Sequence, residues 1–149
     1  MSKDQVIGNA SRKRGLRIIG RHGHPEVKQC LIRFAKWLRK EHEFPVRLNV
    51  YLFPDKFITA KDGDDKCLTT MWLPDSHEKY PYIRIATGDY EDRKKQDGRD
   101  NALASDIHLF CRSIIKYWQW LETNEFWEQG VNRKATAILR RYDQTTDHP

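Results

Sequence analysis

Residues 109–121 have the sequence LFCRSIIKYWQWL, which carries the clearest structural signal in this 149-residue chain. Together with the residues before them they contain an apolar series that recurs in steps of four and three: Leu103, Ile107, Phe110, Ile114, Tyr117 and Leu121. This spacing places the series on one face of an α-helix. Asp100 or Asn101 is a suitable N-cap, so we predict a helix from there to about Leu121.

The residues upstream predict one further helix followed by strands. Pro25 suits the first turn of a helix, and apolar residues at helical spacing continue the pattern to about residue 42. Pro45 ends this helix. Alternating apolar residues and intervening turn residues then predict strands over residues 46–53, 57–60, 66–73 and 82–86.

The order of these elements predicts the fold class. A third helix after Thr123 or Asn124 has apolar residues at helical spacing, so we expect an α+β fold: a backing helix, a mostly antiparallel sheet of three or four strands, and two C-terminal helices. Residues 1–23 are basic, and glycines interrupt them. We therefore predict a flexible basic arm over residues 1–23 and a single domain over residues 24–149.

Composition limits the class of protein further. The chain is 38% hydrophobic and 11% aromatic, enough for one core, and it contains no run of the ~18 apolar residues that a membrane span needs. The N-terminus has no signal-peptide pattern. Cys30, Cys67 and Cys111 are far apart in the sequence, which favours reduced thiols. We expect a cytoplasmic protein that does not associate with membranes.

The end of the quoted segment resembles a known motif. Tyr117-x-Gln119-Trp120 is similar to the second half of the helix His-Glu-x-x-His-Tyr-x-Gln-Trp of small bacterial zincin-like proteins, which are zinc metallopeptidases with a third, Glu ligand. In this register Arg112, Ser113 and Lys116 stand at the His, Glu and His positions. Asn132 then stands at the third-ligand position, with Ala135 as the small residue three positions later. The resemblance covers roughly residues 82–149.

The residues at these positions lack the chemistry of the family. A zincin helix binds zinc through two His residues four positions apart, and the Glu polarises the metal-bound water. Arg112 and Lys116 offer no lone pair to a metal at neutral pH, and Ser113 has no carboxylate. We therefore expect no metal, no cofactor and no catalytic residue of this type.

The resemblance implies a function that needs no metal. The last strand before the active-site helix of a zincin is an edge strand that pairs with an extended peptide, and this role would fall to residues 82–86. The implied cleft residues are Ile83, Arg84, Ile85, Tyr117 and Gln119. Strand addition depends on main-chain hydrogen bonds. The implied function is that of a metallopeptidase-like pseudoenzyme that binds a protein or peptide partner.

Other interpretations of the sequence stay open. The aromatic residues of the helix are also compatible with a core face of an unrelated α+β domain. A net charge of +6 and a pI near 9.3 allow a nucleic-acid-binding accessory protein, whose contacts would be Arg12, Lys13, Arg14 and Arg17. A hydrolase with a site of another kind is the third alternative. The sequence predicts no oligomeric state.

Overall fold

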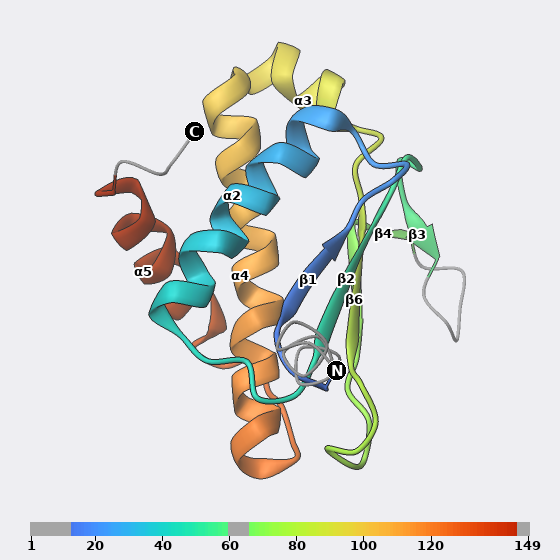
Figure 1. Ribbon diagram of the computed structural model, residues 1–149. Helices are drawn as coiled ribbons and strands as arrows, with labels where there is room; N and C mark the ends of the chain where they lie inside the picture. Colours follow the sequence, from blue (N-terminus) through green and yellow to red (C-terminus); the bar gives the residue numbers. More distant parts are fainter. Residues whose placement is uncertain (1–12, 60–65, 146–149) are drawn as a thin grey trace, which may run out of the picture.

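The computed structural model describes residues 13–59 and 66–145 (Figure 1). A four-stranded sheet has the order β1-β2-β6-β5, in which the strands are β1 (Leu16–Ile19), β2 (Leu48–Phe53), β6 (Tyr82–Ala86) and β5 (Thr69–Trp72). A separate pair consists of β3 (Ile58–Thr59) and β4 (Lys66–Cys67). The helices are α2 (Pro25–Glu41), α3 (Tyr90–Asp97), α4 (Arg99–Thr123) and α5 (Val131–Asp143). The α+β class and the two C-terminal helices are confirmed.

The pairing within the sheet differs from the prediction. Strands β1, β2 and β6 are parallel, and only β5 is antiparallel to its neighbour, whereas a mostly antiparallel sheet was expected. Parallel neighbours need a long crossover connection, and α2 provides it between β1 and β2. The predicted backing helix is therefore a crossover between two parallel strands, because β1 precedes it in the sheet.

The strand β1 lies within the predicted flexible arm. Leu16 is buried, and the main chain of Gly15 both donates to the Phe44 carbonyl (2.8 Å) and accepts from the Leu48 N–H (2.9 Å). Residues 16–19 therefore belong to the sheet, which corrects the expected extent of the arm. Its sequence, Leu-Arg-Ile-Ile, ends in two consecutive apolar residues, so it lacks the clear alternation that would identify a strand. Residues 1–12 lie outside the described part of the chain.

The helices lie on one side of the sheet. Figure 1 shows α2 and α4 against one face of the sheet and α5 on the far side of these helices. Side chains from the inner face of the sheet, such as Val50 and Ile83, are fully buried. Between the helices, the ring of Phe34 lies 5.9 Å from that of Phe110 and 5.0 Å from that of Tyr142. None of the helices that the structure describes covers the opposite face of the sheet.

Two aromatic residues of α4 form hydrogen bonds with the loops at one end of the sheet. The Tyr117 hydroxyl donates to the carbonyl of Val46 and accepts from the Val46 N–H (3.2 Å). The buried Trp120 indole donates to the carbonyl of Pro74 (2.7 Å). These residues thus have structural partners, as the alternative of a core face proposed. Across residues 13–59 and 66–145, none of the helices combines the length and the apolarity that crossing a membrane requires.

Candidate functional site

The helix α4 forms the floor of an open hollow of about 770 Å³. The predicted positions Arg112 on α4 and Asn132 on α5 both line it, and Leu68, next to β5, lines it as well. Further lining comes from α4, including Asn101, Ser105 and His108. The structure thus brings Arg112 and Asn132 to the same hollow, whereas Lys116 and Ser113 are not among its lining residues. Leu68 is the lining residue that lies next to β5.

One carboxylate holds the two cations of α4. Arg112 donates from Nη2 to Glu128 Oε2 (2.7 Å), and the Lys116 ammonium pairs with Glu128 Oε1. Hydrogen bonding from Lys116, together with the charges of Lys116 and Arg112, lowers the pKa of Glu128. Glu128 lies between α4 and α5, and the sequence analysis did not identify it. Lys116 and Arg112 therefore share one carboxylate as their ion-pair partner.

The other predicted residues of α4 point into the protein. Ser113 is buried, and so are Tyr117 and Gln119. The Gln119 carboxamide oxygen accepts from the Trp127 N–H (2.9 Å). Burial raises the pKa of the Tyr117 hydroxyl. Neither Tyr117 nor Gln119 is among the residues that line the hollow over α4. Gln119 instead lines a separate pocket of about 340 Å³ between α4 and α5, together with Trp127 and Lys134.

The strand β6 is not an edge strand. It pairs with β2 on one side and with β5 on the other, so no partner chain can pair with its main chain. Ile83 and Ile85 are buried against the helices, whereas Arg84 lies on the opposite face of the sheet. The predicted cleft of Ile83, Arg84 and Ile85 is thus corrected. The described sheet has four strands, within the expected three or four, and its strand β5 pairs with the side of β6 that β2 leaves free.

The edge on this side of the sheet belongs to β5. The Ala86 N–H donates to the Leu68 carbonyl (2.9 Å), which means that every second residue from Leu68 onward directs its main chain toward β6. The N–H and C=O groups of Thr69 and Met71 consequently point away from β6. Within the described part of the chain, no residue forms a hydrogen bond with these groups. The edge of β5 is therefore open beside the hollow over α4.

The opposite edge of the sheet is closed in part. The Arg39 guanidinium on α2 donates from Nη1 to the carbonyl of Leu16 in β1 (2.8 Å). Burial lowers the pKa of Arg39, with the nearby charge of Arg17 as the second cause. A side chain that occupies an outward carbonyl blunts a sheet edge. The two edges of the sheet therefore differ in their capacity to accept another strand.

A buried ion-pair network lies at the far end of the hollow. Arg93 on α3 pairs with Asp106 on α4 (2.8 Å) and with Asp89 (3.2 Å). Burial raises the pKa of Asp106 to about 6, although Arg93 opposes this change. Among the residues that the structure describes, no cluster of three His, Cys, Asp or Glu side chains is suited to a metal ion. Asp106 is thus tied to Arg93, and sequence reasoning gave no signal for the pair.

The predicted nucleic-acid contacts lie at the start of the sheet. Lys13 and Arg14 are exposed just before β1, and Arg17 is exposed on it. Arg12 lies outside the described residues.

Comparison of the chain with known protein families, with curated proteins and with solved structures finds no match. The resemblance to zincin-like proteins consequently stays a prediction based on the motif.

Proposed function

We propose that this chain is a catalytically inactive, metallopeptidase-like scaffold that binds an extended segment of a protein or peptide partner along β5. The observation that carries the proposal is the open edge of β5 beside the hollow over α4. Thr69 and Met71 direct their main-chain groups away from β6, and an extended segment can pair with these groups by strand addition. This assigns to β5 the role that the sequence analysis gave to residues 82–86.

The cations of α4 suggest the chemistry of the partner. Arg112 and Lys116 lie one helical turn apart and share Glu128, whose side chain is 64% exposed. An exposed ion pair of this kind contributes about 0.2 to 1 kcal/mol, so another carboxylate can compete with Glu128. The two cations and one internal carboxylate leave a net charge of +1. We therefore favour a partner segment that carries acidic residues.

The same positions argue against peptidase chemistry. Arg112, Ser113 and Lys116 supply neither metal ligands nor a carboxylate base, and Ser113 is buried. Cys30, Cys67 and Cys111 are free thiols, which supports a place in a reducing, cytoplasmic compartment. The proposed function is therefore binding, without turnover of the bound segment.

The test measures peptide binding by fluorescence anisotropy. The probe is a fluorescein-labelled decapeptide of alternating valine and glutamate, with a valine and lysine peptide as the matched control. We expect the acidic peptide to bind. Met71→Pro removes an outward N–H of β5 and should abolish binding, whereas Ile18→Pro makes the same change on β1 and should retain it. Thermal unfolding confirms that both variants are folded.

A second variant tests the role of the cations. Glu128→Gln removes the internal competitor, so the acidic peptide should bind about two- to five-fold more tightly, as expected for an exposed ion pair. The double variant Arg112→Gln, Lys116→Gln should weaken the same peptide. Equal affinity of the acidic and basic peptides, or unchanged binding by Met71→Pro, would disprove the proposal.

A further inference from the structure

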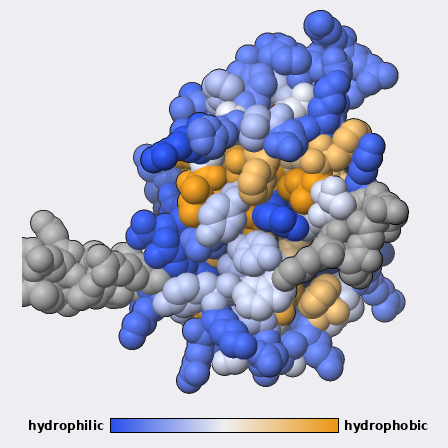
Figure 2. Space-filling model, turned by 90° about the vertical axis from the view of Figure 1, so that its right-hand side faces the viewer, coloured by the Kyte–Doolittle hydropathy of each residue, from blue (hydrophilic) through white to orange (hydrophobic). Residues whose placement is uncertain are grey.

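The outer face of the four-stranded sheet has an unusual set of side chains. Residues that alternate with the buried ones project from this face, and the register aligns them in two rows across the strands. The first row is Arg17, Asn49, Tyr82 and Trp72; the second is Ile19, Tyr51, Arg84 and Thr70. Figure 2 shows this face of the molecule, where apolar and pale side chains gather between hydrophilic margins.

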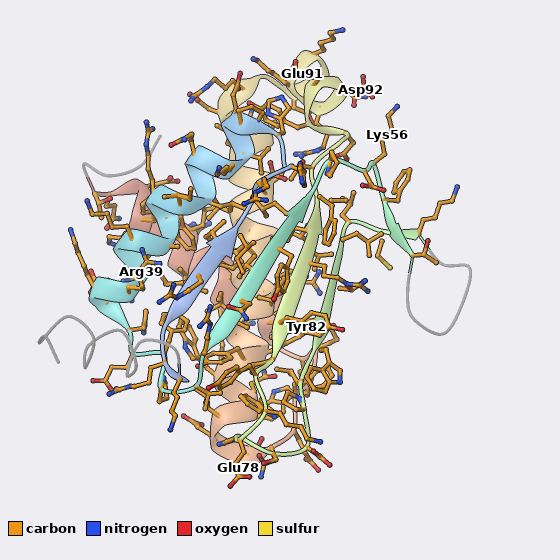
Figure 3. The ribbon with its side chains drawn as sticks, turned by 45° about the vertical axis from the view of Figure 1, so that its right-hand side comes forward. Arg39, Lys56, Glu78, Tyr82, Glu91 and Asp92 are labelled. Atoms are coloured by element: carbon orange, nitrogen blue, oxygen red, sulfur yellow. The ribbon has the colours of Figure 1, made fainter. Side chains whose placement is uncertain are left out.

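Three aromatic rings form a continuous group on this face. The Tyr82 ring centroid lies 5.6 Å from that of Trp72 on β5 and 6.3 Å from that of Tyr51 on β2. Figure 3 labels Tyr82, which projects from β6 on the side away from the helices. Trp72 is 37% exposed. These rings present accessible surfaces rather than filling the core, which lies on the other side of the sheet.

The charges on this face have one sign. Its two rows contain Arg17 and Arg84 and no carboxylate. The Arg84 Nε donates to the Thr70 hydroxyl (3.0 Å), and its guanidinium carbon lies 6.0 Å from the centroid of the Tyr82 ring. Elsewhere the basic side chains Arg93, Lys94 and Arg112 have carboxylate partners. Within the described chain, neither Arg17 nor Arg84 forms an ion pair.

We propose that this aromatic and basic face binds single-stranded nucleic acid by stacking bases on Tyr82, Trp72 and Tyr51. Aromatic side chains on an open sheet with adjacent cations suit unpaired bases and their phosphates. Lys13 and Arg14 are exposed before β1 and extend the basic surface toward the same end of the sheet. The net charge of +6 favours a polyanion.

The same observations disfavour other occupants. In a duplex the bases stack on one another, so their faces are not accessible to rings on a sheet. A second copy of this chain would bring the cations of one face against those of the other, and such like-charge contacts are unfavourable. The inference is independent of the proposed peptide site, which uses the edge of β5 and α4.

The test is anisotropy of a fluorescein-labelled 15-nucleotide oligouridylate, with a 15-base-pair duplex as the competing probe. Trp72→Ala and Tyr82→Ala should each weaken oligouridylate binding about five-fold or more, since one stacked base contributes about 1 to 3 kcal/mol. Trp72→Phe should retain most of the affinity. Thermal unfolding and circular dichroism identify any variant that fails to fold.

The salt dependence of binding distinguishes binding at this face from non-specific electrostatic binding elsewhere on the protein. Arg84→Gln should reduce the slope of the logarithm of affinity against the logarithm of salt by about 0.7, the value for one phosphate contact of a single strand. Arg133→Gln removes an exposed cation from α5 and should leave the slope unchanged. Glu128→Gln should not alter oligouridylate binding, so the two proposals can fail separately.

Three results would overturn the inference. The first is a duplex that binds as tightly as the single strand. The second is an equal loss of oligouridylate affinity in Trp72→Ala and Arg133→Gln. The third is a dimer in analytical ultracentrifugation that Trp72→Ala dissociates, because the face would then be occupied by a second copy of the chain.

Discussion

Replacing Asp106 by asparagine should stabilise the protein at neutral pH. Asp106 is 5% exposed, and Arg93 donates from Nη2 to its Oδ1 (2.8 Å). Its Oδ2 is buried and has no hydrogen-bond partner among the described residues. Asparagine can keep the hydrogen bond from Arg93 and leaves one buried polar atom without a partner, as aspartate does. The substitution therefore mainly removes the charge, while Arg93 keeps its ion pair with Asp89.

The pKa of Asp106 gives the magnitude of this effect. Burial raises the pKa from its ordinary value of 3.8 to about 6, although the charge and the hydrogen bond of Arg93 lower it. Each pKa unit corresponds to about 1.4 kcal/mol, so ionised Asp106 reduces the free energy of unfolding by up to about 3 kcal/mol. Between about pH 4 and pH 6 the folded chain binds this proton more readily than the unfolded chain. The stability contribution of Asp106 consequently falls as the pH rises through this window.

The assay is urea unfolding of the wild type and Asp106→Asn at several pH values. We expect the variant to be about 2 to 3 kcal/mol more stable at pH 7, with the difference disappearing below about pH 4. Asp100→Asn is the control, since this exposed carboxylate on α4 should change stability by less than about 1 kcal/mol. A variant that is less stable than the wild type at pH 7 would refute the reasoning. It would show that the attraction of Arg93 outweighs the cost of burying the carboxylate.

Two further predictions concern α4. Tyr117→Phe removes a buried hydroxyl that both donates to and accepts from the main chain of Val46. Thermal and urea unfolding should therefore show a free energy of unfolding that is lower by about 1 to 3 kcal/mol. The exposed control Tyr80→Phe should lower it by less than about 0.5 kcal/mol. Protein purified without chelators should contain far less than one zinc per chain by elemental analysis, because Arg112 and Lys116 offer no lone pair to a metal at neutral pH. One tightly bound zinc per chain that is lost in Lys116→Ala would contradict the register.

The long helices could be predicted because their packing requires a regular pattern. The series ending at Tyr117 and Leu121 predicted a helix close to the observed α4, and Pro25 correctly marked the start of α2. The strand at residues 82–86 was also predicted with its exact bounds. Each of these elements buries one face, so the apolar residues must recur with the period of the element.

The arrangement of the strands could not be predicted in the same way. The sequence of β1, Leu-Arg-Ile-Ile, does not alternate throughout. The direction of pairing also depends on which strand lies next to it in the sheet, which periodicity does not reveal. Without β1, nothing in the sequence requires α2 to be a crossover between parallel strands. The interior position of β6 could not be predicted for the same reason. Periodicity identifies which face of a strand is buried, but it does not identify the neighbouring strands.

The candidate site could likewise be predicted only in part from the sequence. The register placed Arg112 and Asn132 on neighbouring helices, and the structure brings both to one hollow. Glu128 was missed because it lies in the loop after α4, where no periodicity applies. The available signal was compositional: two cations one helical turn apart need an anion nearby. The carboxylates in the twelve residues after Lys116 are Glu122, Glu125 and Glu128.

Glu128 also explains how the two cations of α4 can coexist. Arg112 and Lys116 are like charges at a spacing of four residues, an arrangement that destabilises a helix by a few tenths of a kcal/mol. Glu128 accepts from both, so the repulsion is compensated without burying an unpaired charge. This compensation relies on an exposed loop rather than on the core. An external carboxylate can therefore replace Glu128 while the fold persists, because the core contacts of α4 are made by the opposite face of the helix.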